Sequence, residues 1–154
     1  MSTPSIRRVS HLAILCAPNA QQLIDEYAAE CSNRLIGPIA QQPEIYAQLE
    51  ASGIIAFLGV YEADDELIGF GSFVTAVLPH NGRKIASSES IFVTRDHRSI
   101  GTARGLMNAL EDLATESGCV AFFYMAPDES QFAKLLAASH SYTRTNVVYC
   151  RSLA

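Results

Sequence analysis

The sequence predicts an α/β fold built on a mixed, mostly antiparallel sheet with helices on both faces. Apolar residues at helical spacing dominate the first third of the chain, and alternating, strand-like runs fill the middle. The last third alternates helix and strand, which requires crossover connections that lay helices against the sheet. We expect a single domain over residues 1–154 with six to seven strands.

The composition excludes several classes of protein. The chain has 154 residues, of which 49% are hydrophobic and 18% charged, so a disordered or fibrous chain is excluded. No apolar run approaches the ~18 residues of a spanning helix, and the net charge of −5 disfavours nucleic acid. We therefore expect neither a membrane nor a nucleic-acid partner. Four scattered cysteines without a C-x-x-C pair favour buried thiols and a cytoplasmic location.

The first part of the chain supplies two helices and then a meander. Helical spacing predicts helices over residues 18–31 and 43–51. Asn81-Gly82 predicts a hairpin turn between the last two strands of the meander. The strands expected here are, in chain order, 5–9, 54–61, 67–77 and 86–93.

The last part of the chain predicts a β-α-β-α-β succession. Apolar residues recur at three- and four-residue steps over 102–117, and Gly118 follows as a helix stop. Residues 119–125 are apolar throughout, as in a strand buried on both faces. A helix over 129–138 and a closing strand over 145–151 complete the order.

The segment between strand 86–93 and helix 102–117 has the pattern of an anion site. A helix start offers unpaired amides and a partial positive charge, and small residues at Gly101 and Ala103 allow a ligand close to them. Arg98 adds positive charge. The alternative is an ordinary strand–loop–helix junction with a solvated basic loop.

Arg98-Ser-Ile-Gly101-Thr-Ala103 resembles the R/Q-x-x-G-x-G/A signature of the GNAT superfamily of N-acetyltransferases, and the element order is similar over nearly the whole chain. The resemblance implies acetyl-CoA as the acyl donor, no metal, and a sheet splayed between its fourth and fifth strands. Backbone near the end of strand 86–93 would hold the pantetheine arm, and the loop with the helix start would hold the pyrophosphate. The cofactor-binding residues implied are Ile91, Phe92, Val93, Arg98, Ser99, Ile100, Gly101, Thr102 and Ala103.

Acyl transfer to an amine requires a base for the ammonium and an acid for the departing thiolate. Glu89 is the expected base, because many relatives place a carboxylate there; the alternative is a solvated or salt-bridged strand residue. A bulge in the strand would alter which side chains reach the site. Many relatives carry the acid, a Tyr, where this chain has Ala137, so Tyr124, His140 or water is left for that role.

The resemblance implies an enzyme that moves an acetyl group from acetyl-CoA directly to a primary amine of a small molecule, peptide or protein. The acidic balance favours a cationic acceptor. Pairing into homodimers is common in such families. One alternative is a non-catalytic acyl-CoA-binding or interaction module, which Ala137 supports. Another is a different phosphate-bearing cofactor on the same fold.

Overall fold

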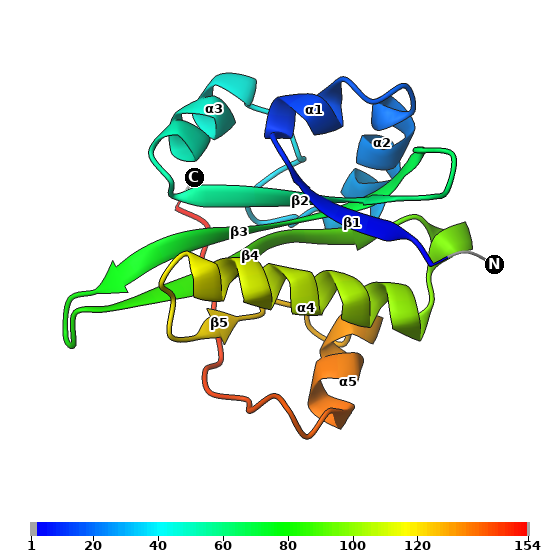
Figure 1. Cartoon of the computed structure of the whole chain (residues 1–154). Helices are drawn as coiled ribbons and strands as arrows, with labels where there is room; N and C mark the ends of the chain where they lie inside the picture. The colour runs from blue at the N-terminus through cyan, green and yellow to red at the C-terminus, as the bar shows by residue number, and fades with distance from the viewer. Residues whose placement is uncertain (1–2, 154) are drawn as a thin grey trace.

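The computed structural model describes residues 3–153, which fold around one five-stranded sheet in the order β1-β2-β3-β4-β5 (Figure 1). The first four strands pair antiparallel, and β5 pairs parallel to β4. The strands are β1 (Ser5–Val9), β2 (Ile55–Tyr61), β3 (Leu67–Leu78), β4 (Arg83–Val93) and β5 (Phe122–Phe123).

Helices cover both faces of the sheet, as expected (Figure 1). The helices are α1 (His11–Leu15), α2 (Ala20–Cys31), α3 (Pro43–Ala51), α4 (Ile100–Glu116) and α5 (Gln131–Ala138), with a 3₁₀ turn at Arg95–His97. One core forms where α4 packs on the sheet through the fully buried Leu106 and Leu110. A second core lies under α1–α3, around Leu23 and the rings of Phe57 and Phe70.

The local signals for turns and helix ends are confirmed. Gly82 adopts φ +67° in the turn between β3 and β4, and Gly118 adopts φ +82° directly after α4. Both values lie in the left-handed region that glycine enters without a steric penalty. Ser99 caps α4, since its Oγ accepts a hydrogen bond from the amide of Thr102 at 3.0 Å.

The expectation of six to seven strands is wrong, since the sheet of the described residues has five. The expected closing strand over 145–151 does not form, and Val148 and Tyr149 there are 82% and 91% exposed. An apolar, β-prone sequence becomes a strand only where another strand's backbone pairs with it, and residues 145–151 belong to no strand of the described sheet. The strand expected over 119–125 shortens to Phe122–Phe123 for the same reason.

Two further details differ from the expectations. The helix expected over 18–31 is preceded by the short α1, whose start is capped by Ser10. The cysteines are not fully buried: Cys16 is exposed just after α1, Cys150 is exposed in the segment expected to form the closing strand, and the other two are half-buried. Across residues 3–153, no helix has the length and apolar content needed to cross a membrane.

A bulge in β4 decides how the sheet opens. Ser72 of β3 pairs with Ser90, but the next residue, Phe73, pairs with Ser88, so Glu89 is an extra residue in β4. Bulges bend a strand and increase its twist. The ladder between β4 and β5 ends at Ser87, immediately before the bulge, while β4 continues along β3 to its end.

Candidate active site

The bulge in β4 determines which way Glu89 faces. In regular alternation Glu89 would share a face with Ile91, which packs against the core under α4. Instead Glu89 and its neighbour Ser90 both line a pocket on the α1–α3 side of the sheet. The extra residue therefore brings a carboxylate to the face opposite the one that simple alternation gives.

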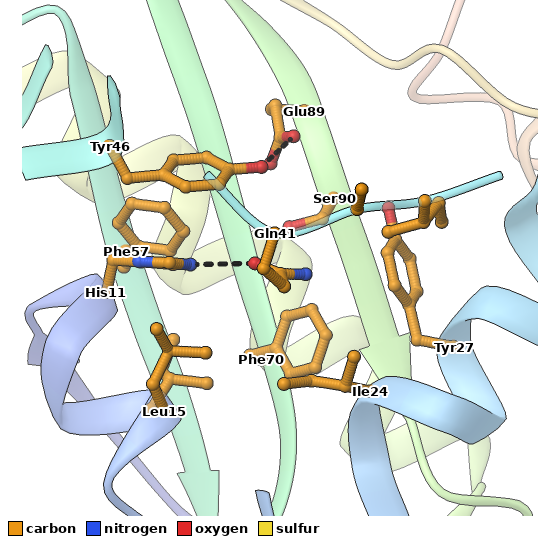
Figure 2. A pocket seen from close by; sticks show the side chains of 13 residues that line it. His11, Leu15, Ile24, Tyr27, Gln41, Tyr46, Phe57, Phe70, Glu89 and Ser90 are labelled. Atoms are coloured by element: carbon orange, nitrogen blue, oxygen red, sulfur yellow. Dashed lines mark hydrogen bonds between the residues drawn. The ribbon is translucent and has the colours of Figure 1, made fainter. Parts of the chain in front are cut away.

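Hydroxyl groups from two other elements hold the Glu89 carboxylate. Tyr46 of α3 donates through Oη to Oε1 at 3.0 Å (Figure 2). Ser72 of β3 donates through Oγ to Oε2 at 2.6 Å, and its Oγ also lies 2.7 Å from Ser90 Oγ. Because a hydroxyl has one proton, Ser90 donates to Ser72 while Ser72 donates to the carboxylate. This chain of hydrogen bonds fixes the position of the Glu89 carboxylate.

Two tyrosines beside the carboxylate are held in their protonated form. Burial raises the pKa of Tyr46 well above its usual range, and the negative charge of Glu89 adds to the effect. Burial likewise raises the pKa of Tyr27 of α2, again with a contribution from Glu89. Both rings meet the pocket as neutral phenols, and Tyr46 uses its proton in the hydrogen bond to Glu89.

The pocket has a cavity volume of about 190 Å³ and lies between α1, α2, α3 and the sheet (Figure 2). His11 stacks on Tyr46 with their centroids 4.0 Å apart, and its Nε2 lies 3.0 Å from Gln41 Oε1. The residues that line the pocket are His11, Ile14, Leu15, Ile24, Tyr27, Ile39, Ala40, Gln41, Tyr46, Phe57, Phe70, Glu89 and Ser90.

The end of β4 presents backbone groups away from β3. The amide of Thr94 donates to Ile68 O, and in an antiparallel ladder the hydrogen-bonded pairs alternate. The polar groups of Ile91 and Val93 therefore face the edge that β5 no longer covers, whereas Phe92 pairs with β3 and buries its ring among α1–α3. An extended acyl-CoA arm can pair with such an edge as an added strand would.

The first turn of α4 lies beside that edge and suits an anion. Thr102 and Ala103 donate their amides to Ser99, so the amides of Ile100 and Gly101 remain as the helix-start donors without an intrahelical partner. A Cβ at Gly101 would meet only Ser99 Oγ, at 3.7 Å, so a ligand can approach this backbone closely. The residues present therefore fit the pyrophosphate of a coenzyme A thioester.

The arginines of this loop also bind the opposite helix. Arg98 donates from Nε to Val93 O and from Nη2 to Glu30 of α2, both at 2.7 Å, and Arg95 donates to the other Glu30 oxygen at 3.0 Å. Burial alone would raise the pKa of Glu30, but hydrogen bonds from Arg98 and Arg95 outweigh it and hold that pKa below its usual value. Arg98 thus joins the helix start to α2, and part of its charge is balanced by Glu30.

Comparison with known proteins agrees with this geometry. A model of the acetyltransferase (GNAT) family matches residues 20–137, from the start of α2 to α5. The chain belongs to the GNAT acetyltransferase family. Comparison with curated proteins gives no match.

Solved GNAT structures share the fold at low sequence identity. An aminoglycoside acetyltransferase from an uncultured soil metagenomic sample superposes with a TM-score of 0.74 at 17% identity, covering 97% of each chain. The ribosomal-protein-alanine N-acetyltransferase of Brucella melitensis biovar Abortus 2308 gives 0.70 at 22% identity, covering 97% of this chain and 99% of that one. Glucosamine-6-phosphate N-acetyltransferase from Arabidopsis thaliana gives 0.71 at 12% identity, covering 99% and 100%.

The structure of this GNAT acetyltransferase does not bring Tyr124 together with Glu89. Tyr124 Oη donates to Glu111 of α4 at 2.7 Å, and Tyr142 donates to the same carboxylate oxygen at 2.9 Å. Burial, with the Glu111 contact, raises the pKa of Tyr142 to about 12. His140 is exposed beyond α5.

Sequence reasoning missed the residues that complete the GNAT pocket around Glu89. These residues are Tyr46, Tyr27 and Ser72, which come from three elements far apart in the chain. No local sequence pattern predicts that they lie together around Glu89. Ser72 and Tyr46 look like ordinary strand and helix residues in the sequence. Within residues 3–153, no group of three or more His, Cys, Asp or Glu side chains is placed to hold a metal ion.

Proposed function

We propose that this GNAT acetyltransferase moves an acetyl group from acetyl-CoA directly to a primary amine of a small molecule or peptide, with Glu89 as the base. The observation that supports it is the position of Glu89 in the wall of an aromatic pocket, on the strand whose edge is left without a partner strand where the ladder with β5 ends at Ser87. The amine can then reach Glu89 from the pocket on the face of the sheet, and the acyl donor can lie along the uncovered edge of β4. The solved relatives are named for aminoglycosides, a ribosomal protein and glucosamine-6-phosphate.

The protein's part in the reaction is to bind, orient and move protons. Acetyl-CoA, when bound, supplies the activated acetyl thioester. Glu89 takes the proton of the acceptor ammonium, so that the nitrogen lone pair is available to form the new C–N bond as the C–S bond breaks. Tyr46 and Ser72 keep the carboxylate in place before the amine arrives. The amides of Ile100 and Gly101 hold the pyrophosphate.

We propose water as the acid that protonates the departing thiolate. The Tyr124 hydroxyl would have to break its 2.7 Å bond to Glu111 before it could serve. Tyr124→Phe is therefore expected to lower stability while turnover stays within about twofold, below the change that loss of an acid produces. If turnover at saturating acetyl-CoA instead fell by about 100-fold, Tyr124 would be the acid.

The base is tested by Glu89→Gln, with thiol release from acetyl-CoA measured over a panel of amines. Loss of a general base lowers kcat by about 10²–10⁴-fold, while acetyl-CoA affinity holds, because the substituted side chain faces the pocket side. Glu116→Gln is the matched control, since Glu116 is exposed at the far end of α4. Unchanged turnover in Glu89→Gln would remove Glu89 from the mechanism.

The acyl-CoA site is tested by Gly101→Glu in a thermal melt. Acetyl-CoA at 100-fold over its Kd stabilises the native protein by about 2.7 kcal/mol, roughly 5–10 °C here. A glutamate at Gly101 has room, and its charge suits a helix start, so the variant folds but repels the pyrophosphate and loses the shift. Asn108→Glu, on an exposed position of the same helix, keeps the shift. A full shift in Gly101→Glu would place the ligand elsewhere.

The same two assays separate the alternative functions. A melting shift with acetyl-CoA, without thiol release for any amine, indicates a non-catalytic acyl-CoA-binding module. A shift with ATP as large as that with acetyl-CoA indicates another phosphate-bearing cofactor.

A further inference from the structure

We propose that the acceptor is a compact amine with a single positive charge and an apolar body, such as an arylalkyl or branched alkyl amine, and that polycationic amines are excluded. The inference rests on the proposed function, because it assigns the pocket beside Glu89 to the acceptor. It is carried by the size, lining and charge of that pocket.

The size of the pocket limits the body of the acceptor. Its volume of about 190 Å³ compares with about 150 Å³ for a cavity that accepts benzene in another protein. A six-membered ring or a branched chain of similar size fills such a space, with a short arm to reach the carboxylate. An amino sugar of several rings does not fit within it.

The lining of the pocket favours an apolar body next to one ammonium group. Rings of Phe57 and Phe70 form its floor on the sheet, and both are buried. Tyr27 meets Phe70 edge-on at 5.4 Å, and Tyr46 meets Phe57 edge-on at 5.6 Å, so the aromatic walls are already packed in place. Aromatic faces attract both apolar groups and a cation.

The charge of the pocket limits the acceptor to one ammonium. Of the thirteen described residues that line it, Glu89 is the one carboxylate. A second ammonium inside the pocket would lie against apolar walls without a counter-charge, which is costly. A second hollow, lined by the carboxylates Glu44 and Glu50, lies beyond His11, and Glu50 already accepts the His11 amide with both oxygens at 3.2 Å.

The test compares acceptors of different charge and bulk. Thiol release is measured with 2-phenylethylamine, 3-methylbutylamine, spermidine, kanamycin and a tripeptide with N-terminal alanine, and binding of each is measured by saturation-transfer NMR. We expect kcat/KM for the two monoamines to exceed that for the polycations by about 100-fold, as an unpaired charge in an apolar site requires. Higher kcat/KM for spermidine, kanamycin or the tripeptide would overturn the inference.

A pair of tryptophan variants locates the acceptor. Ala40→Trp adds bulk to the pocket and is expected to abolish monoamine binding, whereas Ala47→Trp, which adds the same bulk to the hollow beyond His11, leaves it unchanged. Loss of binding in Ala47→Trp alone would overturn the assignment.

The binding measurement separates the two proposals. Monoamine binding that Ala40→Trp abolishes, without acetyl transfer, supports the inference and contradicts the proposed function. Acetyl transfer to other amines, without monoamine binding, supports the function and overturns the inference.

Discussion

Ser72→Ala removes the hydroxyl that links Ser90 to Glu89 beneath the pocket. Ser72 is 0% exposed and Ser90 is 7% exposed, so water cannot easily replace the lost partner at Ser90, while Glu89 is exposed and can be rehydrated. The substitution therefore leaves the buried Ser90 hydroxyl without its hydrogen-bond partner, and water replaces part of what the Glu89 carboxylate loses. The expected loss in the free energy of unfolding is about 1.5 kcal/mol, which lowers Tm by about 3–6 °C.

Ser72→Ala also tests whether Ser72 positions the Glu89 carboxylate for catalysis, apart from its effect on stability. Tyr46 still holds one oxygen of Glu89, so we expect kcat to fall by about tenfold through misplacement of the carboxylate, with the KM for acetyl-CoA unchanged. Urea unfolding measures the first effect, and thiol release at saturating acetyl-CoA measures the second. Ser87→Ala, on β4 before the bulge, is the control. Stability within about 0.5 kcal/mol of the wild type, together with full kcat, would refute the reasoning.

Three further changes test the fold and the loop that precedes α4. Leu110→Ala empties a fully buried position between α4 and the sheet and is expected to cost about 2–5 kcal/mol in chemical unfolding. Gly69→Ala would put a Cβ 2.5 Å from Phe92 O, so we expect a loss of about 1–3 kcal/mol; a neutral result would show that β3 and β4 can shift apart. Glu30→Gln is expected to lower stability by about 0.5–1 kcal/mol at pH 7. Because the pKa of Glu30 is lower in the folded protein, the difference should shrink as pH falls below its ordinary value of 4.5, and a constant difference across pH would contradict the Arg98 contact.

The sequence predicted the elements whose signals are local. The spacing of apolar residues gave α4 and α3, Asn81-Gly82 gave the hairpin, and Gly118 gave the end of α4. The small residues after Arg98 predicted the helix start that the structure shows there, and the anion site at that helix start stays a prediction.

The sequence failed where an element depends on a distant partner. Residues 145–151 have the composition of a strand, yet no neighbouring strand pairs with them in the part of the chain that the structure describes. β5 is short because its ladder with β4 ends at Ser87, before the bulge. Pairing is a property of two segments, so composition of one segment cannot decide it.

The sequence by itself determined the fold class, the GNAT signature and Glu89 as the candidate base. Only the tertiary structure decided that the Glu89 side chain lies on the α1–α3 face of the sheet, because one extra residue in β4 interrupts the alternation of side chains along the strand. It also decided that Tyr46 and Ser72 hold that carboxylate, and that Glu30 binds Arg98. The physical reason is the same in each case: helical and turn preferences act over a few neighbouring residues, whereas a pocket is made by residues that only the packing of the sheet brings together.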